Sequence, residues 1–201
     1  HQAYGSGGSQ PQTPTGSGGG LGAVGIVGIG VTPIDASIST SPPITVPYWG
    51  TIKGTNILGQ TISHNIGIEW ADGSLKAIDP NKSTWLVIHG MENNPPQGDI
   101  LNELGDIKNL AKAVDGFSPD DQVLVLDWRS AAYSPGVDYG FFAPPNPIVG
   151  ASWIDRVATW TADTLRQWGI AGSNINLVGH SLGAYVAAEI AAKIPGGVND
   201  I

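Results

Sequence analysis

A serine framed by two glycines is the part of this sequence with the clearest chemistry. The segment Gly179-His180-Ser181-Leu182-Gly183 fits the pattern G-x-S-x-G. This pattern is typical of a nucleophile elbow, a sharp strand-to-helix turn that lifts a serine hydroxyl clear of the backbone so that it can attack an acyl carbon. The turn presses the two glycine positions against each other, and glycine tolerates this because it has no Cβ. Ser181 is therefore our candidate nucleophile.

Attack on an acyl carbon creates an oxyanion, which needs hydrogen-bond donors aimed at it. The N–H of Leu182 follows the nucleophile and opens a helix, whose N-terminus favours negative charge. A second donor is expected from the loop after the apolar run 84–88, where His89-Gly90-Met91 stands. We predict that the N–H of Met91 is this donor and that Gly90 gives the backbone room to turn.

Three other polar residues are candidates for proton transfer, and none is assigned to it. Asp127 is expected to bind Arg129 or loop amides, because the triad of such hydrolases runs serine, acid, histidine along the chain. His180 is adjacent to Ser181, so its side chain points elsewhere and is expected to pack or to support the turn. His64 is expected to be exposed. No set of histidines and carboxylates has metal-ligand spacing, so no metal or cofactor is predicted.

The segment after Ser181 offers no base. Only twenty residues follow, they include no histidine, and their carboxylates are Glu189 and Asp200. The sequence therefore presents a nucleophile without a base. Because it begins with His1 rather than Met, we expect a fragment or a processed product, with the triad acid and histidine downstream.

Alternating strands and helices are predicted to position these residues. Short apolar runs predict buried strands at 84–88, 122–126 and 175–178. Helical periodicity predicts helices at 99–115, 149–168 and 182–194. The alternation predicts an α/β fold with a mostly parallel sheet and helices on both faces. The segments at His89, Asp127 and Ser181 then follow the carboxyl ends of three strands, where active sites lie in such sheets.

The N-terminal part differs in composition from the rest. Residues 1–43 are rich in Gly, Ser, Thr and Pro, which is typical of a disordered linker, and we place the folded domain at 44–201. This domain is expected to open with strand-like pieces, a turn at Gly50 and Gly54, and a hairpin over 66–78. An aromatic loop at 131–147 suits an apolar acyl substrate, although such loops more often serve packing.

Composition excludes several classes of function. The net charge is −8 and there is no basic cluster, which argues against nucleic acid as a partner. The absence of cysteine excludes disulfides, thiolate metal sites and a cysteine nucleophile. The longest apolar run, 21–31, is interrupted by glycines and is too short for a transmembrane segment.

Three segments together resemble the pancreatic-lipase-type family of α/β-hydrolases, particularly its bacterial members. They are, in chain order, His89-Gly90, Val125-Leu126-Asp127-Trp128-Arg129-Ser130 and Val178-Gly179-His180-Ser181-Leu182-Gly183-Ala184. The resemblance covers residues 66–201 and implies the N-terminal part of an α/β-hydrolase fold, truncated after the elbow helix.

The resemblance implies hydrolysis of carboxylic esters, typically acylglycerols or phospholipids, at a possible lipid–water interface. Ser181 matches the nucleophile, and Met91 and Leu182 match the oxyanion donors. The family's histidine, lid and calcium site lie downstream, and Asp200 falls before the family's triad acid. The lack of cysteine departs from the disulfide-rich animal members and leaves lipid specificity open. Secretion is expected from the family and the linker composition.

Two other functions remain open at this point. One is a non-catalytic binding or surface module on a lipase-like scaffold. The other is a peptidase or thioesterase that uses the same elbow. The retained serine and its two glycines favour an ester hydrolase over the first alternative.

Overall fold

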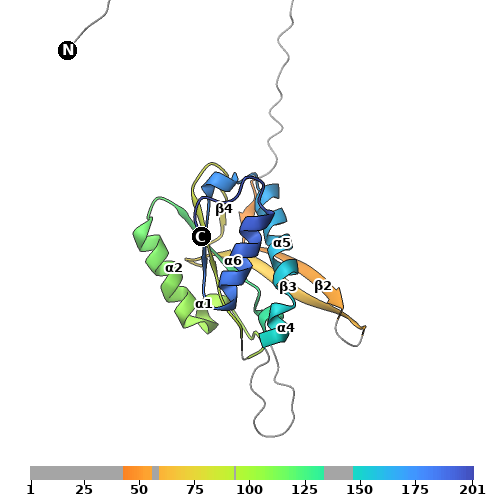
Figure 1. Cartoon of the computed structure of the whole chain (residues 1–201). Coiled ribbons are helices and arrows are strands. Elements are labelled where there is room, and N and C mark those ends of the chain that lie inside the picture. Colours follow the sequence, from red (N-terminus) through yellow and green to blue (C-terminus); the bar gives the residue numbers. More distant parts are fainter. Residues whose placement is uncertain (1–42, 56–58, 93, 134–146) are drawn as a thin grey trace, which may run out of the picture. The chain divides into compact units, whose positions relative to one another are not determined.

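The computed structural model describes residues 43–55, 59–92, 94–133 and 147–201 (Figure 1). The predicted linker lies outside the described residues except for its last position, and so does nearly all of the aromatic loop. Among the described residues, no helix combines the length and the apolar character that crossing a bilayer requires.

A five-stranded mixed sheet forms the centre of the fold, with the strand order β2-β3-β6-β5-β7. Its parallel part consists of β5 (Thr84–Ile88), β6 (Gln122–Asp127) and β7 (Ile175–Gly179). Its antiparallel part consists of β2 (Tyr48–Thr55) and β3 (Thr61–Trp70). A separate two-stranded sheet pairs β1 (Thr45–Val46) with β4 (Lys76–Ala77). The predicted α/β class is confirmed, and the carboxyl ends of three adjacent parallel strands meet at one edge.

Helices cover both faces of this sheet, as predicted (Figure 1). One face carries α1 (Ile100–Glu103) and α2 (Gly105–Phe117), and the other carries α5 (Ile154–Gln167) and α6 (Leu182–Lys193). Shorter helical turns are α3 (Arg129–Ala132), α4 (Pro147–Ala151) and the 3₁₀ turn Gly172–Asn174.

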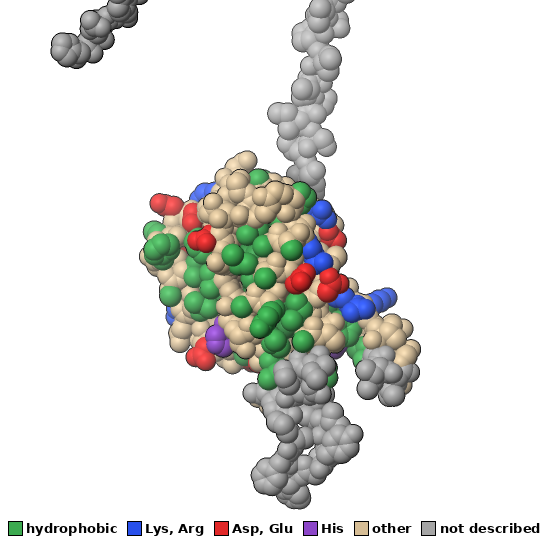
Figure 2. Space-filling model, in the orientation of Figure 1, with side chains coloured by type: hydrophobic (Ala, Val, Ile, Leu, Met, Phe, Trp, Pro, Cys, Tyr) green, Lys and Arg blue, Asp and Glu red, His purple; other side chains and the backbone are tan. Residues whose placement is uncertain are grey.

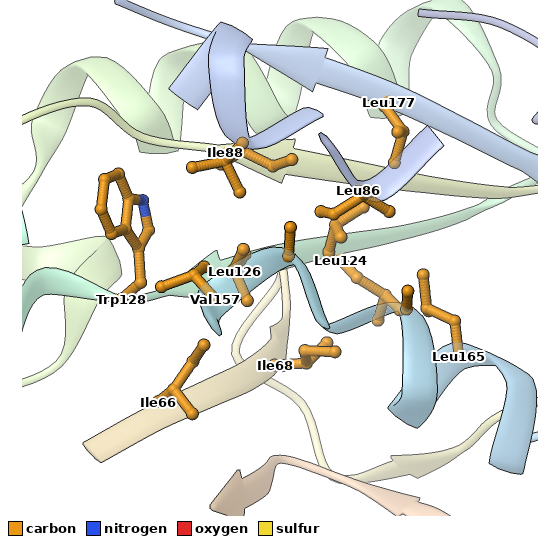
Figure 3. Close-up of a cluster of buried hydrophobic side chains, with 14 of the residues drawn as sticks. Ile66, Ile68, Leu86, Ile88, Leu124, Leu126, Trp128, Val157, Leu165 and Leu177 are labelled. Carbon is orange, nitrogen blue, oxygen red and sulfur yellow. The ribbon is translucent and has the colours of Figure 1, made fainter. Parts of the chain in front are cut away.

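The two cores follow from the alternation of side chains along each strand. On β5 and β6, every second side chain belongs to the core under α5 and α6 (Figure 3). These side chains are Leu86, Ile88, Leu124 and Leu126. The side chains between them belong to the core under α1 and α2, and include Val87, Val123 and Val125. Both strands are therefore apolar at nearly every position, as a strand covered on two faces must be.

Two of the predicted helices are broken in the structure. Asp99 caps α1 as expected, since its carboxylate accepts the N–H of Leu101 at 2.7 Å. Leu104 then leaves the helical region, with φ −107° and ψ 78°, and α2 begins at Gly105. The predicted helix 149–168 is likewise divided at Ser152 and Trp153 into α4 and α5. Apolar periodicity continues across both breaks, so the pattern alone does not reveal them.

The predicted turn at Gly50 and Gly54 is wrong, because β2 runs through both residues. A Cβ on Gly50 would lie 2.8 Å from the indole Cε2 of Trp160, and one on Gly54 would lie 2.7 Å from the indole Cη2 of Trp153. These glycines let the tryptophans of α5 and its N-terminal end lie directly on the strand. Their role is close packing within a strand rather than a change of direction.

The surfaces over α5 and α6 differ in the kinds of side chain that they expose. Figure 2 shows charged side chains of both signs over α5, where Lys193 pairs with Asp155 at 2.7 Å and Arg166 pairs with Asp163. Hydrophobic side chains gather over α6, on which Tyr185 is 66% exposed.

The chain also pairs along the outer edge of β7. Asp200 forms an isolated parallel bridge with Asn176, and its carbonyl accepts the N–H of Leu177 at 3.1 Å. The N–H of Asn199 donates to the carbonyl of Ile175 at 2.8 Å. Asp200 is thus placed beside β7 by backbone pairing.

Candidate active site

The turn between β7 and α6 places Ser181 in a strained conformation. Its φ is 55° and its ψ is −123°, and among the described residues it is the only non-glycine with a positive φ. Three backbone hydrogen bonds hold the turn: the N–H of His180 to the carbonyl of Ile88 at 2.9 Å, that of Gly183 to His180 at 2.9 Å, and that of Ala184 to Ser181 at 3.0 Å. The serine side chain is left exposed at the carboxyl end of the strand.

The two glycines around Ser181 are squeezed as the elbow geometry requires. A Cβ on Gly179 would overlap the carbonyl of Gly183 and lie 2.6 Å from the Cα of Ala184. A Cβ on Gly183 would lie 2.5 Å from the carbonyl oxygen of His89. Backbone atoms block both positions, so no residue larger than glycine fits without moving the turn. The sheet together with this turn has the form of an α/β-hydrolase fold.

The loop after β5 lies directly against the serine. Because β5 and β7 are adjacent and parallel, Ile88 pairs with Gly179 and the two strand ends come side by side. A Cβ on Gly90 would lie 2.8 Å from Cβ and 3.3 Å from Oγ of Ser181. A cleft of about 380 Å³ opens here, lined by His89, Gly90, Met91, Glu92, His180, Ser181 and residues 103–107.

Two backbone N–H groups at this cleft are free of partners among the described residues. They belong to Met91 and to Leu182, the first residue of α6. The N-terminus of a helix favours negative charge, and a free N–H near the serine is what a developing oxyanion requires. The structure thus brings Ser181, Met91 and the start of α6 to one place.

His89 is buried, and both of its ring nitrogens are engaged. Its Nε2 accepts the backbone N–H of Trp128 at 3.2 Å, and its Nδ1 lies 2.8 Å from the carbonyl of Gly90 and 3.2 Å from Oε1 of Glu92. The indole N–H of Trp128 donates to the carbonyl of His89 at 2.9 Å, and the two rings stack at 5.4 Å. His89 is therefore committed to its own loop and is not placed to take a proton from Ser181.

Asp127 forms the ion pair expected from the sequence. Its carboxylate accepts Nε of Arg129 at 2.9 Å and Nη2 at 2.7 Å, and also the backbone N–H of Arg129 at 3.1 Å. Arg129 further contacts Glu103 and donates to the carbonyl of Gly98 at 2.6 Å. Both members of the pair are buried. This network ties the loop before α1 to the end of β6, beside the cleft.

His64 and His180 differ from the sequence prediction in the burial of their side chains. His64 is half-buried rather than exposed: its Nδ1 lies 3.0 Å from Oγ of Ser130, and its ring meets that of Trp153 edge to face at 4.4 Å. Burial lowers the pKa of His64, and a hydrogen bond with the backbone of Ser130 opposes this only in part. The cause is the length of β3, which starts at Thr61 and carries His64 toward α5.

The sequence predicts that His180 packs or supports the turn. Its side chain is exposed at the cleft rather than packed, and its support of the turn comes from its backbone. The turn is held through the backbone N–H and carbonyl of His180, which leaves its imidazole free to face solvent.

The described residues do not supply a base to the serine. Within residues 43–55, 59–92, 94–133 and 147–201, no histidine or carboxylate hydrogen-bonds to Oγ of Ser181. Trp128 and Glu92 are among the residues of this site to which the sequence analysis gave no role. Trp128 stands in the Asp127-Trp128-Arg129 segment, but its pairing with His89 across 39 positions has no signal in a single sequence.

Comparisons with known proteins give one sequence relative and several distant structures. No protein-family model matches the chain. It is 30% identical to a phospholipase A1 of Vespula maculifrons over 116 residues, covering 54% of this chain and 34% of the relative. The chain thus spans about a third of that relative's length.

Among solved structures, the chain is similar to a hyperthermophilic esterase of the archaeon Pyrobaculum calidifontis, at 18% identity and a TM-score of 0.34 over 72% of this chain and 38% of that one. It is also similar to the esterase Est22, at 17% identity and a TM-score of 0.37 over 74% of this chain and 39% of that one.

Proposed function

We propose that this chain carries the nucleophile and the oxyanion hole of a serine ester hydrolase. The observation that carries the proposal is the strained backbone of Ser181, squeezed between Gly179 and Gly183 and pressed against Gly90. Strain of this kind persists where the surrounding structure enforces it, and it exposes the hydroxyl. The similarity to a phospholipase A1 supports the same reading.

In the proposed reaction, Oγ of Ser181 attacks the carbonyl carbon of an ester while its proton passes to a base. The carbonyl oxygen becomes an oxyanion that accepts hydrogen bonds from the N–H groups of Met91 and Leu182. The intermediate then collapses, the C–O bond to the alcohol breaks, and the alcohol leaves with the proton. Water releases the carboxylic acid from the acyl-serine by the same steps. This chemistry needs no metal or cofactor.

The base and its acid partner are proposed to come from a longer form of the chain, in the order serine, acid, histidine. Without them, the oxyanion hole and binding leave only about 10³–10⁴-fold acceleration over water. The substrate is proposed to be a fatty-acyl ester, of the acylglycerol or phospholipid type, reached from a lipid–water interface. Secretion is proposed from the composition of the linker and from the family that the sequence resembles.

A second candidate is a lipase-like module that binds without catalysis. The observation that favours it is the missing base at Ser181 among the described residues. Peptidase or thioesterase activity at the same elbow differs only in the leaving group, and the assay below separates these cases.

The test compares hydrolysis of p-nitrophenyl butyrate, a matched amide and a matched thioester by the full-length natural protein. Ser181→Ala is expected to abolish ester hydrolysis, and Ser130→Ala serves as the matched control, since the hydroxyl of Ser130 lies 3.0 Å from Nδ1 of His64 and Ser130 is not among the described residues that line the cleft. A fluorophosphonate should form its adduct on Ser181. Unchanged ester turnover in Ser181→Ala would refute the proposed nucleophile. The absence of both turnover and adduct in the unaltered protein would favour the binding module.

A further inference from the structure

Among the described residues, the peptide group between Gly90 and Met91 has a hydrogen-bond partner at its carbonyl and none at its N–H. Its carbonyl oxygen lies 2.8 Å from Nδ1 of His89, and its N–H belongs to Met91 at the cleft. The peptide is trans, so its carbonyl and its N–H point in opposite directions. A hydrogen bond that holds the carbonyl of Gly90 therefore also sets the direction of the N–H of Met91.

This peptide needs such a hold because of its own residues. Gly90 has no Cβ, and its backbone is free to populate conformations closed to other residues. A flip of the Gly90–Met91 peptide would exchange its two ends and present a carbonyl oxygen to the cleft. A carbonyl facing an oxyanion repels it, whereas an N–H stabilises it.

The tautomer of His89 is set by a second contact on the far side of the ring. The backbone N–H of Trp128 can only donate, so Nε2 of His89, 3.2 Å away, must accept and carry the lone pair. The ring proton then resides on Nδ1, facing the carbonyl of Gly90 and Oε1 of Glu92 at 3.2 Å. Glu92 is itself anchored, since its N–H donates to the carbonyl of Ala132 at 3.2 Å.

We propose that His89 is the positioning residue of the oxyanion hole: its Nδ1–H holds the carbonyl of Gly90 and thereby keeps the N–H of Met91 aimed into the cleft. Trp128 and Glu92 act through His89 by holding its ring and its tautomer. His89 touches neither the substrate nor Ser181 in this role. The inference rests on the proposed ester hydrolase function.

Two amide side chains separate this role from simple packing. In His89→Asn the side-chain amide nitrogen takes the place of Nδ1 and retains the donor to Gly90. In His89→Gln the amide takes the place of Nε2 and retains the contact with Trp128 but not the donor. The full-length protein should lose about 10²–10³-fold in kcat in His89→Gln, with KM little changed, as when one oxyanion donor is lost. His89→Asn should keep most of kcat.

The outcomes distinguish the inference from the function on which it rests. Full activity in Ser181→Ala would remove the proposed function itself. Inactive Ser181→Ala together with unchanged kcat in His89→Gln would overturn only the positioning role. Equal losses in both His89 variants, or a greater loss in His89→Asn, would show that His89 acts by packing or through Trp128.

A measurement on the unaltered protein keeps the inference testable if His89→Gln does not fold. Long-range ¹⁵N–¹H spectra of histidine-labelled protein show which ring nitrogen carries the proton, and His1→Gln, His64→Gln and His180→Gln assign the signals of the other three histidines of this sequence. We expect a protonated Nδ1 and an unprotonated Nε2 on His89. The opposite tautomer would overturn the inference.

Discussion

The backbone of Gly90 lies against the hydroxyl of Ser181, although 91 positions separate them in the sequence, and a Cβ at Gly90 would come within 3.3 Å of that oxygen. The contact exists because β5 and β7 are neighbours in register, with Ile88 opposite Gly179. The loop after β5 and the turn at Ser181 are therefore parts of one packed unit, and a change in either shifts the other.

A methyl group at Gly90 is the most direct test of this contact. Gly90→Ala would bring Cβ to 2.8 Å from Cβ of Ser181 and 3.0 Å from the carbonyl oxygen of His180, so the turn must move. We expect a loss of about 1–3 kcal/mol of unfolding free energy, as for an overpacked site. Reaction of Ser181 with a fluorophosphonate should slow as well. Chemical denaturation and labelling followed by mass spectrometry measure the two effects.

Gly116→Ala is the matched control for this substitution. Gly116 lies within α2, and a Cβ there meets nothing within 4 Å. Alanine should be neutral or should stabilise the helix by up to about 1 kcal/mol. Similar losses in both variants would show that the region around Ser181 is less tightly packed than described.

The buried pair of Asp127 and Arg129 should contribute to stability more than any exposed pair. Asp127→Asn leaves Arg129 buried with Glu103 as its remaining charged partner. We expect a loss of about 3 kcal/mol, near the lower end for a broken buried pair. Asp163→Asn breaks the pair with Arg166. The side chain of Arg166 is 49% exposed and that of Asp163 is 45% exposed, so the loss of unfolding free energy should be less than about 1 kcal/mol. Urea unfolding of both variants tests this, and equal effects would contradict it.

Glu69 should make the stability of the fold depend on pH. Burial, together with the nearby charges of Asp99 and Asp127, raises the pKa of Glu69 from 4.5 to about 7, and Arg129 opposes this. The folded state therefore binds more protons than the unfolded state between these two values. The stabilisation by protonated Glu69 is complete below the unfolded pKa and is lost as the pH rises through about 7.

Glu69→Gln removes this titration while keeping the shape of the side chain. The variant should gain stability relative to the unaltered protein as the pH rises from 5 to 8. Urea midpoints over this range measure the gain. A stability difference that does not change with pH would contradict the assignment.

The glycine at position 50 tests the packing of α5 on β2. Gly50→Ala places a Cβ against Nε1 and 2.8 Å from Cε2 of Trp160, which is partly buried and packs against the core beside the strand. We expect a loss of about 1–3 kcal/mol, with a change in tryptophan fluorescence as the ring shifts. Gly105→Ala, where a Cβ meets nothing within 4 Å, should have neither effect.

The central strands and the elbow were predictable because they depend on local patterns. The strands β5, β6 and β7 are short apolar runs, and the helix α6 follows a glycine-framed serine, so one window of sequence is sufficient for each. The length of β3 was not predictable, because four of the five residues from Thr61 to Asn65 are polar and the segment is held in the strand by pairing with β2. In the sequence, Gly50 indicates a turn, and only the structure shows that Trp160 packs on it.

In the candidate site, the residues that stand at strand ends were likewise predictable from local patterns. Ser181 and the His89-Gly90-Met91 loop stand at strand ends, and the order of the strands brings strand ends together. What a single sequence does not reveal are pairings between distant side chains. The contacts of His89 with Trp128, and of His64 with Ser130, arise from neighbouring strands and depend on their register.

The strained backbone of Ser181 also implies a trade-off between the stability of the fold and the proposed activity. At φ 55° and ψ −123° a glycine would be relaxed, whereas the serine is strained by about 1–3 kcal/mol. Selection for a long-lived fold alone would favour glycine at this position. Under the proposed function, the serine is kept at the expense of local stability, so gains in thermal tolerance are to be sought at sites remote from this turn.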